Sequence, residues 1–265
     1  MAERLRSPTR PRDEARMTII EHLEELRSRI IKVAIVFVVA AVVAAFFVPQ
    51  IFDWLLEPSG LKKLNNLGPA QGLITDMKLV LYVAFLLTIP VLLYQAWMFV
   101  APAVGEVGRT FTYVLVGMAS SLFLAGVAFG YYVVLPVGLE FLLNYASDRY
   151  DEMITADTYL PFVTRFLLAF GIVFELPAAT YVGAKLGLIG ASSLKRYRKH
   201  AIVVNAVLAA ALTPGQDPFS MILMMIPMVL MYEASILIAR FVNPVVPEEP
   251  LPAPLPEDDE EERDL

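Results

Sequence analysis

Long apolar segments recur along this chain, and they limit its possible folds more than any other feature. About 20 apolar residues are needed to cross the roughly 30 Å hydrocarbon core of a bilayer. Four segments are about that long and two shorter ones follow; in order, the six are 30–48, 77–100, 111–136, 161–188, 200–212 and 219–239. Because lipid offers the backbone no hydrogen bonds, such segments form helices. The sequence therefore predicts an all-α, polytopic membrane protein with six transmembrane helices.

The composition agrees with this class and excludes several functions. The chain is 57% hydrophobic and only 18% charged, with a mean hydropathy of +0.62. It has no cysteine, which excludes disulfides, thiolate metal sites and thiol nucleophiles, and its two histidines, His22 and His200, are far apart. Motifs of metalloproteases, serine hydrolases and nucleotide-binding enzymes are absent from the sequence. We therefore expect no enzyme activity, no cofactor and no metal site.

The distribution of basic residues predicts the orientation. An even number of spans places both termini on one side of the membrane, and 16 of the 21 Lys and Arg residues fall on that side. The positive-inside rule then makes both termini cytoplasmic (N-in, C-in). The longer external segments, 49–76 and 137–160, are predicted to fold as caps over the bundle. A formal net charge of −6 argues against nucleic acid as a partner.

The chain divides into two parts by composition. Residues 1–242 hold the apolar segments and a cytoplasmic amino-terminal helix, and they are predicted to form the membrane domain. Residues 243–265, "NPVVPEEPLPAPLPEDDEEERDL", are rich in proline and then acidic. Such a segment has no apolar face to bury, so we predict that it is a disordered cytoplasmic tail.

Two carboxylates fall inside predicted spans, Glu175 in the fourth and Glu233 in the sixth. An ionisable group at that depth is expensive and marks a functional candidate; the alternative is a protonated acid with one interhelical hydrogen bond. Pro177 and Pro227 lie nearby and predict kinked helices. A kinked helix with an internal carboxylate suggests a concave surface that water reaches locally. Asp217, in the external turn before the sixth span, is a further candidate near the membrane plane, although Asp in such a turn more often caps a helix.

A charged stretch, "HLEELRSRI", precedes the first span. Thr18 and Glu21 have the spacing of a capping box, which predicts a helix that starts there and continues into the membrane. On that helix His22, Glu25 and Arg29 share one face, and Glu25 and Arg29 form a favourable i, i+4 pair. The pair is either a helix brace or part of a site that binds a cationic ligand.

Four stretches together resemble the TatC family of the twin-arginine protein translocase. "HLEELRSRI" resembles the amino-terminal HLxELRxR motif, and the others, in order, are "IPVLLYQAWMFVAPA", "FGIVFELP" and "LTPGQDPFSMILMMIPMVLMYEASI". The resemblance covers about residues 18–242. It implies a glove-shaped bundle with a concave face in the cell membrane. It also implies partnership with the single-span subunits TatA and TatB, homo-oligomers within the complex, and transport of folded proteins driven by the proton-motive force.

The resemblance also implies that twin-arginine signal peptides bind at the cytoplasmic face. Glu25 matches the glutamate of the motif, and a carboxylate binds a guanidinium in a bidentate fork. Three more residues of this helix are assigned to the same site: His22, Arg27 and Arg29. Two arginines need two acceptors, but in "APAVGEVGRT" Gly108 stands where the family carries a glutamate. Our hypothesis is that Glu106 replaces it; the alternative is that Glu106 is a solvated loop charge.

Three other interpretations stay open at this stage. The chain could be a divergent TatC paralogue with weakened signal recognition. It could be a proton-coupled secondary transporter that uses Glu175 and Glu233 as relays, although such folds usually contain repeated halves, which this sequence does not display clearly. It could also be a structural scaffold, which would leave the cytoplasmic carboxylates without a ligand.

Overall fold

The computed structural model describes residues 19–100, 109–145, 153–212 and 218–242. Within these ranges the chain is helical, and its only β feature is an isolated bridge between Asn65 and Thr155. The elements, in order, are α1 (Ile19–Phe46), α2 (Val48–Leu56), the 3₁₀ turn η1 (Glu57–Ser59), α3 (Gln71–Val100), α4 (Arg109–Phe129), the π-helical turn η3 (Gly130–Val134), α5 (Leu135–Asn144), α6 (Ala156–Phe174), α7 (Leu176–Lys185), α8 (Ala191–Arg196), α9 (Arg198–Leu212) and α10 (Pro218–Val242). The predicted all-α class is confirmed.

Among the described residues, five helical stretches are long and apolar enough to cross a membrane: His22–Phe46, Gln71–Phe99, Tyr113–Asn144, Ala156–Lys185 and Pro218–Val242. They match five of the six predicted spans. The predicted fifth span is α9, which has 15 residues and rises only about 22 Å at 1.5 Å per residue. A helix this short crosses the hydrocarbon only where the bilayer is thinned, so the sixfold count stays a prediction.

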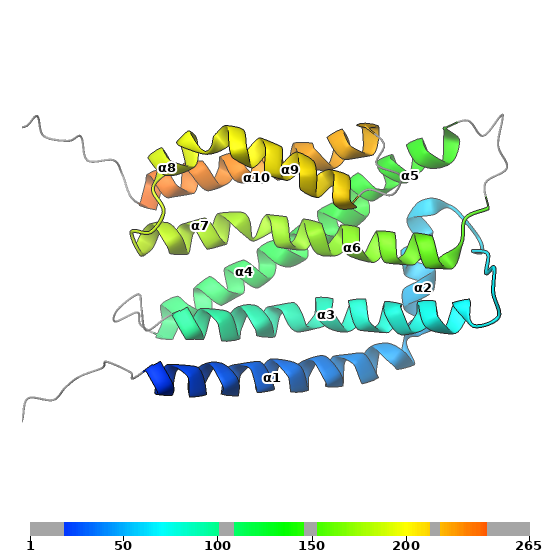
Figure 1. Cartoon of the computed structure of the whole chain (residues 1–265), viewed down its shortest axis with the longest axis horizontal. Helices are drawn as coiled ribbons and strands as arrows, with labels where there is room; N and C mark the ends of the chain where they lie inside the picture. The colour runs from blue at the N-terminus through cyan, green and yellow to red at the C-terminus, as the bar shows by residue number, and fades with distance from the viewer. Residues whose placement is uncertain (1–18, 101–108, 146–152, 213–217, 243–265) are drawn as a thin grey trace, which may run out of the picture.

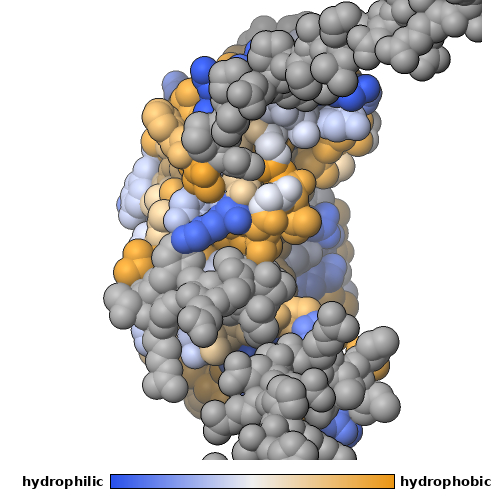
Figure 2. Space-filling view, turned by 90° about the vertical axis from the view of Figure 1, so that its left-hand side faces the viewer, coloured by the Kyte–Doolittle hydropathy of each residue, from blue (hydrophilic) through white to orange (hydrophobic). Residues whose placement is uncertain are grey.

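The long helices lie roughly along one direction, with α2 across it, and Figure 1 places the start of α1 and the end of α10 at the same end of the molecule. In this view α1 and α3 run side by side, α6 continues into α7, and α4 crosses behind α6 at an angle. Figure 2 looks onto that end and shows a body with a bowed outline on which hydrophilic residues are interspersed with apolar ones. This end of the molecule therefore exposes polar as well as apolar residues.

Small residues allow α4 and α6 to approach closely. A Cβ on Gly126 would collide with the carbonyl oxygen of Phe170, and a Cβ on Gly171 would overlap the ring of Phe123. Phe123 and Phe170 are both only 1% exposed. In lipid, association of helices depends on such close packing, because apolar side chains gain little by leaving hydrocarbon for protein. This crossing fixes α6 and therefore the start of α7.

The predicted end of the third span at Pro136 is wrong. The helix continues through η3 and α5 to Asn144, which removes eight residues from the predicted external cap 137–160. Pro136 lies in the first turn of α5, where its missing N–H does least harm, and the wider π-helical turn precedes it. Proline here marks a change of helical pitch and not the end of the helix.

The segment after α1, for which an external cap was predicted, packs against the bundle through α2. In α2 the Trp54 ring stacks on Tyr131 with centroids 4.0 Å apart, and the Tyr131 hydroxyl donates to the Trp54 carbonyl at 2.6 Å. The Tyr159 hydroxyl donates to the Leu55 carbonyl at 2.9 Å. These bonds hold α2 against η3 and α6.

Candidate functional site

The charged start of α1 forms the ion pair that the sequence predicted. The Arg29 Nε donates to Oε1 of Glu25 at 3.1 Å, and Nη2 of Arg29 donates to the same oxygen. The helix is continuous from Ile19 to Phe46, so the i, i+4 spacing brings the two side chains together. Thr18, the predicted cap, lies outside the described residues.

Arg29 also connects α1 to α3. Its Nη1 donates to Oε1 of Gln95 at 3.2 Å and its Nη2 donates to the carbonyl oxygen of Met98 at 3.1 Å. The Arg29 side chain is only 15% exposed, so this guanidinium is held by acceptors from both helices. Our sequence analysis did not identify Gln95 as part of the site. The available signal was an amide within the apolar run "VLLYQAWMFV".

The second oxygen of Glu25 is differently placed. Its Oε2 is buried and has no hydrogen-bond partner among the described residues. The His22 imidazole lies nearby, with its Nδ1 3.9 Å from Oε2, and the His22 ring stacks on Phe99 of α3 with centroids 4.2 Å apart. Glu25 therefore has one oxygen occupied by Arg29 and one that can still accept a hydrogen bond.

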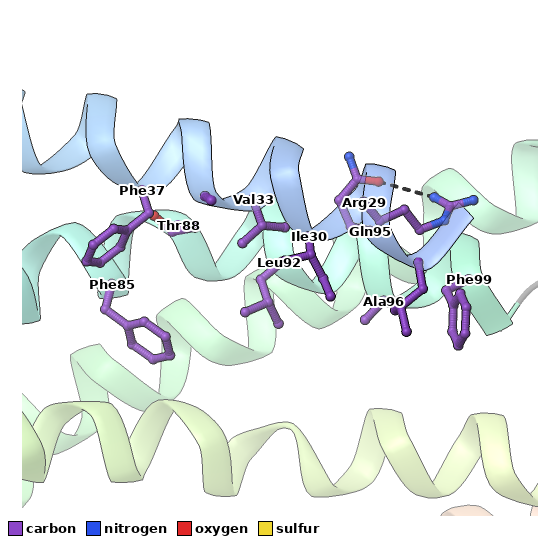
Figure 3. Close-up of a pocket in the computed structure, with 12 residues that line it drawn as sticks. Arg29, Ile30, Val33, Phe37, Phe85, Thr88, Leu92, Gln95, Ala96 and Phe99 are labelled. Atoms are coloured by element: carbon purple, nitrogen blue, oxygen red, sulfur yellow. Dashed lines mark hydrogen bonds between the residues drawn. The ribbon is translucent and has the colours of Figure 1, made fainter. Parts of the chain in front are cut away.

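An apolar groove of about 510 Å³ adjoins this cluster between α1 and α3. Figure 3 shows Arg29, Gln95 and Phe99 toward one end of it and Phe37 and Phe85 toward the other. Its lining is mostly aliphatic and aromatic: Leu26, Arg29, Ile30, Val33, Ala34, Phe37, Phe85, Thr88, Leu92, Gln95, Ala96 and Phe99. The cluster thus combines a carboxylate acceptor with an adjoining apolar surface.

The structure does not bring all predicted site residues together. Arg27 is exposed and follows Glu25 by two residues, which turns it about 200° around the helix. Glu106, Gly108 and Asp217 lie outside the described residues. The cluster at the start of α1 therefore consists of His22, Glu25 and Arg29 together with their partners on α3.

Glu175 interrupts the fourth span, as its neighbouring proline predicted. It lies between α6 and α7, and its N–H donates to the Ile172 carbonyl at 3.0 Å. Pro177 lies in the first turn of α7 and has no N–H to continue the helical pattern. The Glu175 Oε1 is buried and without a hydrogen-bond partner in the described ranges. It adjoins a cavity of about 320 Å³ lined by residues of α3, α4 and α7, among them Trp97, Leu115 and Ala178.

Glu233 has a partner that our sequence analysis missed. The Arg198 Nη2 donates to Oε2 of Glu233 at 2.7 Å, and the two side chains are 47% and 39% exposed. The Tyr232 hydroxyl donates to the Leu194 carbonyl at 2.8 Å, which brings α8 and the start of α9 against α10. In our sequence analysis Arg198 was only one of the 16 basic residues that predict the orientation. Unlike Pro177, Pro227 does not interrupt its helix, since α10 runs unbroken from Pro218 to Val242.

Metal binding has no support in the described part of the chain, where no three His, Asp or Glu side chains gather closely enough to hold an ion. The groups that could act are carboxylates, guanidiniums and one imidazole. Their arrangement suits recognition of a cationic ligand by hydrogen bonds.

Comparison with known proteins adds a family and a fold. Residues 21–227 match the family model described as Sec-independent protein translocase protein (TatC). The chain is 39% identical over 230 residues to the Sec-independent protein translocase protein TatC of Carboxydothermus hydrogenoformans, an alignment that spans 86% of this chain and 95% of that protein. It is 37% identical over 230 residues to TatCd of Bacillus subtilis, spanning 87% and 94%. A crystal structure of the twin-arginine translocase receptor TatC in DDM matches 83% of this chain and 99% of its own, with a TM-score of 0.77 and 36% identity.

Proposed function

The chain belongs to the TatC family of Sec-independent protein translocase proteins, and from that premise we propose that it binds twin-arginine signal peptides at the start of α1. The observation that carries the proposal is the Glu25 carboxylate. One of its oxygens already binds a guanidinium, that of Arg29, and the other is buried without a hydrogen-bond partner among the described residues. The Glu25 carboxylate therefore has a geometry that fits a guanidinium, the group that a signal-peptide arginine presents.

The second arginine of the peptide needs a second acceptor, and we assign that role to Glu106. This residue follows the end of α3 by six positions, so an extended chain reaches at most about 20 Å from Val100. Gln95, Met98 and Phe99 lie in the last two turns of α3, next to Glu25. The connection that carries Glu106 therefore begins beside the Glu25 cluster.

The topology follows from the same proposal. We assign six spans, with α9 as a short fifth one. We place both termini in the cytoplasm, because 16 of the 21 basic residues fall on the side of the termini. The end of the bundle with the Glu25 cluster then faces the cytoplasm in the cell membrane. There the cluster meets the signal peptides of folded cargo proteins.

The partners and the energy source are part of the proposal as well. We infer that the chain assembles with single-span subunits of the TatA and TatB type and with further copies of itself, and that the proton-motive force drives transport. Glu175 and Glu233 are assigned to the membrane part of this process, because each is a carboxylate within a helix long enough to span a bilayer.

Crosslinking to a synthetic signal peptide tests the receptor function directly. A photoreactive twin-arginine peptide is incubated with the purified full chain, and a twin-lysine peptide of otherwise identical sequence serves as the control. We expect crosslinks to residues 22–29 and 101–108 with the arginine peptide only. Equal labelling by both peptides would favour a divergent relative that has lost signal recognition.

A further inference from the structure

We propose that Arg29 is an internal occupant of the arginine site, which an incoming signal-peptide arginine must displace from Glu25. Arg29 holds the carboxylate, and this competition lowers the affinity of the receptor for cationic peptides. The inference rests on the proposed function and adds to it a residue that sets the affinity.

The contacts of Arg29 are those of a bound ligand. Its guanidinium donates to three acceptors: Oε1 of Glu25, Oε1 of Gln95 and the carbonyl oxygen of Met98. Its side chain is 15% exposed, against 22% for Glu25. An exposed helix brace would not need the two acceptors from α3. The arginine is instead enclosed, with its charge shared between a carboxylate and two neutral oxygens.

The second oxygen of Glu25 is a further acceptor for the incoming guanidinium. Oε2 is buried and has no hydrogen-bond partner in the part of the chain that the structure describes, so it becomes available once the surrounding side chains move with Arg29. After exchange Arg29 keeps Gln95 and Met98 as acceptors. Its charge is therefore not left without hydrogen bonds, which makes displacement less costly.

Competition with Arg29 lowers the affinity of the site for every cationic peptide. A guanidinium is a planar fork that binds a carboxylate through two parallel hydrogen bonds, whereas the ammonium group of lysine is a strongly hydrated point charge. The carboxylate therefore prefers an arginine by its own geometry. The cost of displacing Arg29 is the same for both peptides, so it cancels in the ratio of their dissociation constants.

The position of Arg29 also connects peptide binding to the groove. Arg29 and Gln95 lie together toward one end of the apolar groove between α1 and α3 (Figure 3). Through its hydrogen bonds to Gln95 and Met98, Arg29 links α1 to α3. Movement of Arg29 away from Glu25 changes this end of the groove. In a signal peptide the apolar segment follows the charged one, so a peptide bound at Glu25 brings its apolar segment toward the groove.

The test compares dissociation constants of twin-arginine and twin-lysine peptides for the full chain and its Arg29→Gln variant. We expect the variant to bind both peptides about tenfold more tightly than wild type does, the weight of one charge-assisted hydrogen bond, and the ratio of the two dissociation constants to stay unchanged. Lys32→Gln is the matched control: it removes one exposed positive charge from the same helix and should change both dissociation constants much less.

Arg29→Lys is the second variant and keeps the charge. A lysine is a weaker internal competitor, so both dissociation constants should lie between those of wild type and Arg29→Gln. If both Arg29 variants lose affinity for both peptides equally, Arg29 only positions Glu25 and the competition is refuted. Loss of twin-arginine binding in Glu25→Gln would still support the receptor function in that case, whereas wild-type binding in Glu25→Gln would overturn both proposals.

Discussion

Replacing Glu25 by glutamine tests the central assignment with the least disturbance. The change removes one negative charge and keeps the length and shape of the side chain. Its amide oxygen can still accept from Arg29, and Arg29 keeps its bonds to Gln95 and Met98. We therefore expect the free energy of unfolding to fall by less than about 1 kcal/mol, the range of a partly exposed ion pair.

The loss of peptide affinity should be much larger than the loss of stability. A hydrogen bond to a charged group contributes about 1.5–3 kcal/mol net, and a signal-peptide arginine would make up to two of them with the carboxylate. Because the Glu25 side chain is 22% exposed, solvent weakens the pair, and we take about 2–3 kcal/mol in total. This predicts that the dissociation constant rises about 30- to 150-fold.

Fluorescence anisotropy of a labelled twin-arginine peptide on the purified protein measures this change. Glu24→Gln is the matched control, because Glu24 is an exposed carboxylate on the neighbouring position of the same helix and the substitution alters the net charge equally. Wild-type affinity in Glu25→Gln would refute the assignment of Glu25. An equal loss in both variants would mean that the peptide responds only to the overall charge of α1.

Four other predictions concern the remaining candidates. Glu175→Ala should reduce transport or partner assembly more than peptide binding, which reconstituted transport and peptide titration separate; loss of peptide binding alone would contradict the position given to this span. Glu233→Ala should have a milder effect on transport, because Glu233 is exposed and paired with Arg198, and equal severity would reverse this order. Deletion of everything after Pro247 should leave transport nearly unchanged, and a large loss would identify the acidic tail as a binding site. Glu106→Gln should weaken twin-arginine binding and the further change Gly108→Glu should restore it; wild-type binding in Glu106→Gln would show that this connection has lost its receptor role.

Features set by local spacing were predictable from the sequence. The apolar runs predicted five of the observed long helices, because a segment in lipid must satisfy its own backbone hydrogen bonds. The ion pair of Glu25 and Arg29 followed from four-residue spacing on one helix. The interruption at Glu175 followed from Pro177, which cannot donate the hydrogen bond that would continue the helix.

Features that depend on which helices pack together were not predictable in this way. Gln95 became visible as a partner of Arg29 only when α3 was found beside α1, since 66 residues separate them in sequence. The same holds for Arg198 and Glu233, which are 35 residues apart. The continuation of the helix past Pro136 was missed because the proline was taken as a helix end, although the first turn of a helix tolerates it.

The surroundings of the buried carboxylate oxygens of Glu25 and Glu175 suit different ligands. Glu25 lies in the first turns of α1 beside His22 and Arg29, so a charged peptide segment can reach it without crossing hydrocarbon. Glu175 lies about 15 Å along the helix from Lys185, beside a cavity lined mostly by apolar side chains. A cation moved there would lose its hydration, whereas a neutral donor on another transmembrane helix would lose far less. We therefore expect the start of α1 to recognise charge, and Glu175 to form its hydrogen bonds with neutral groups of a neighbouring helix.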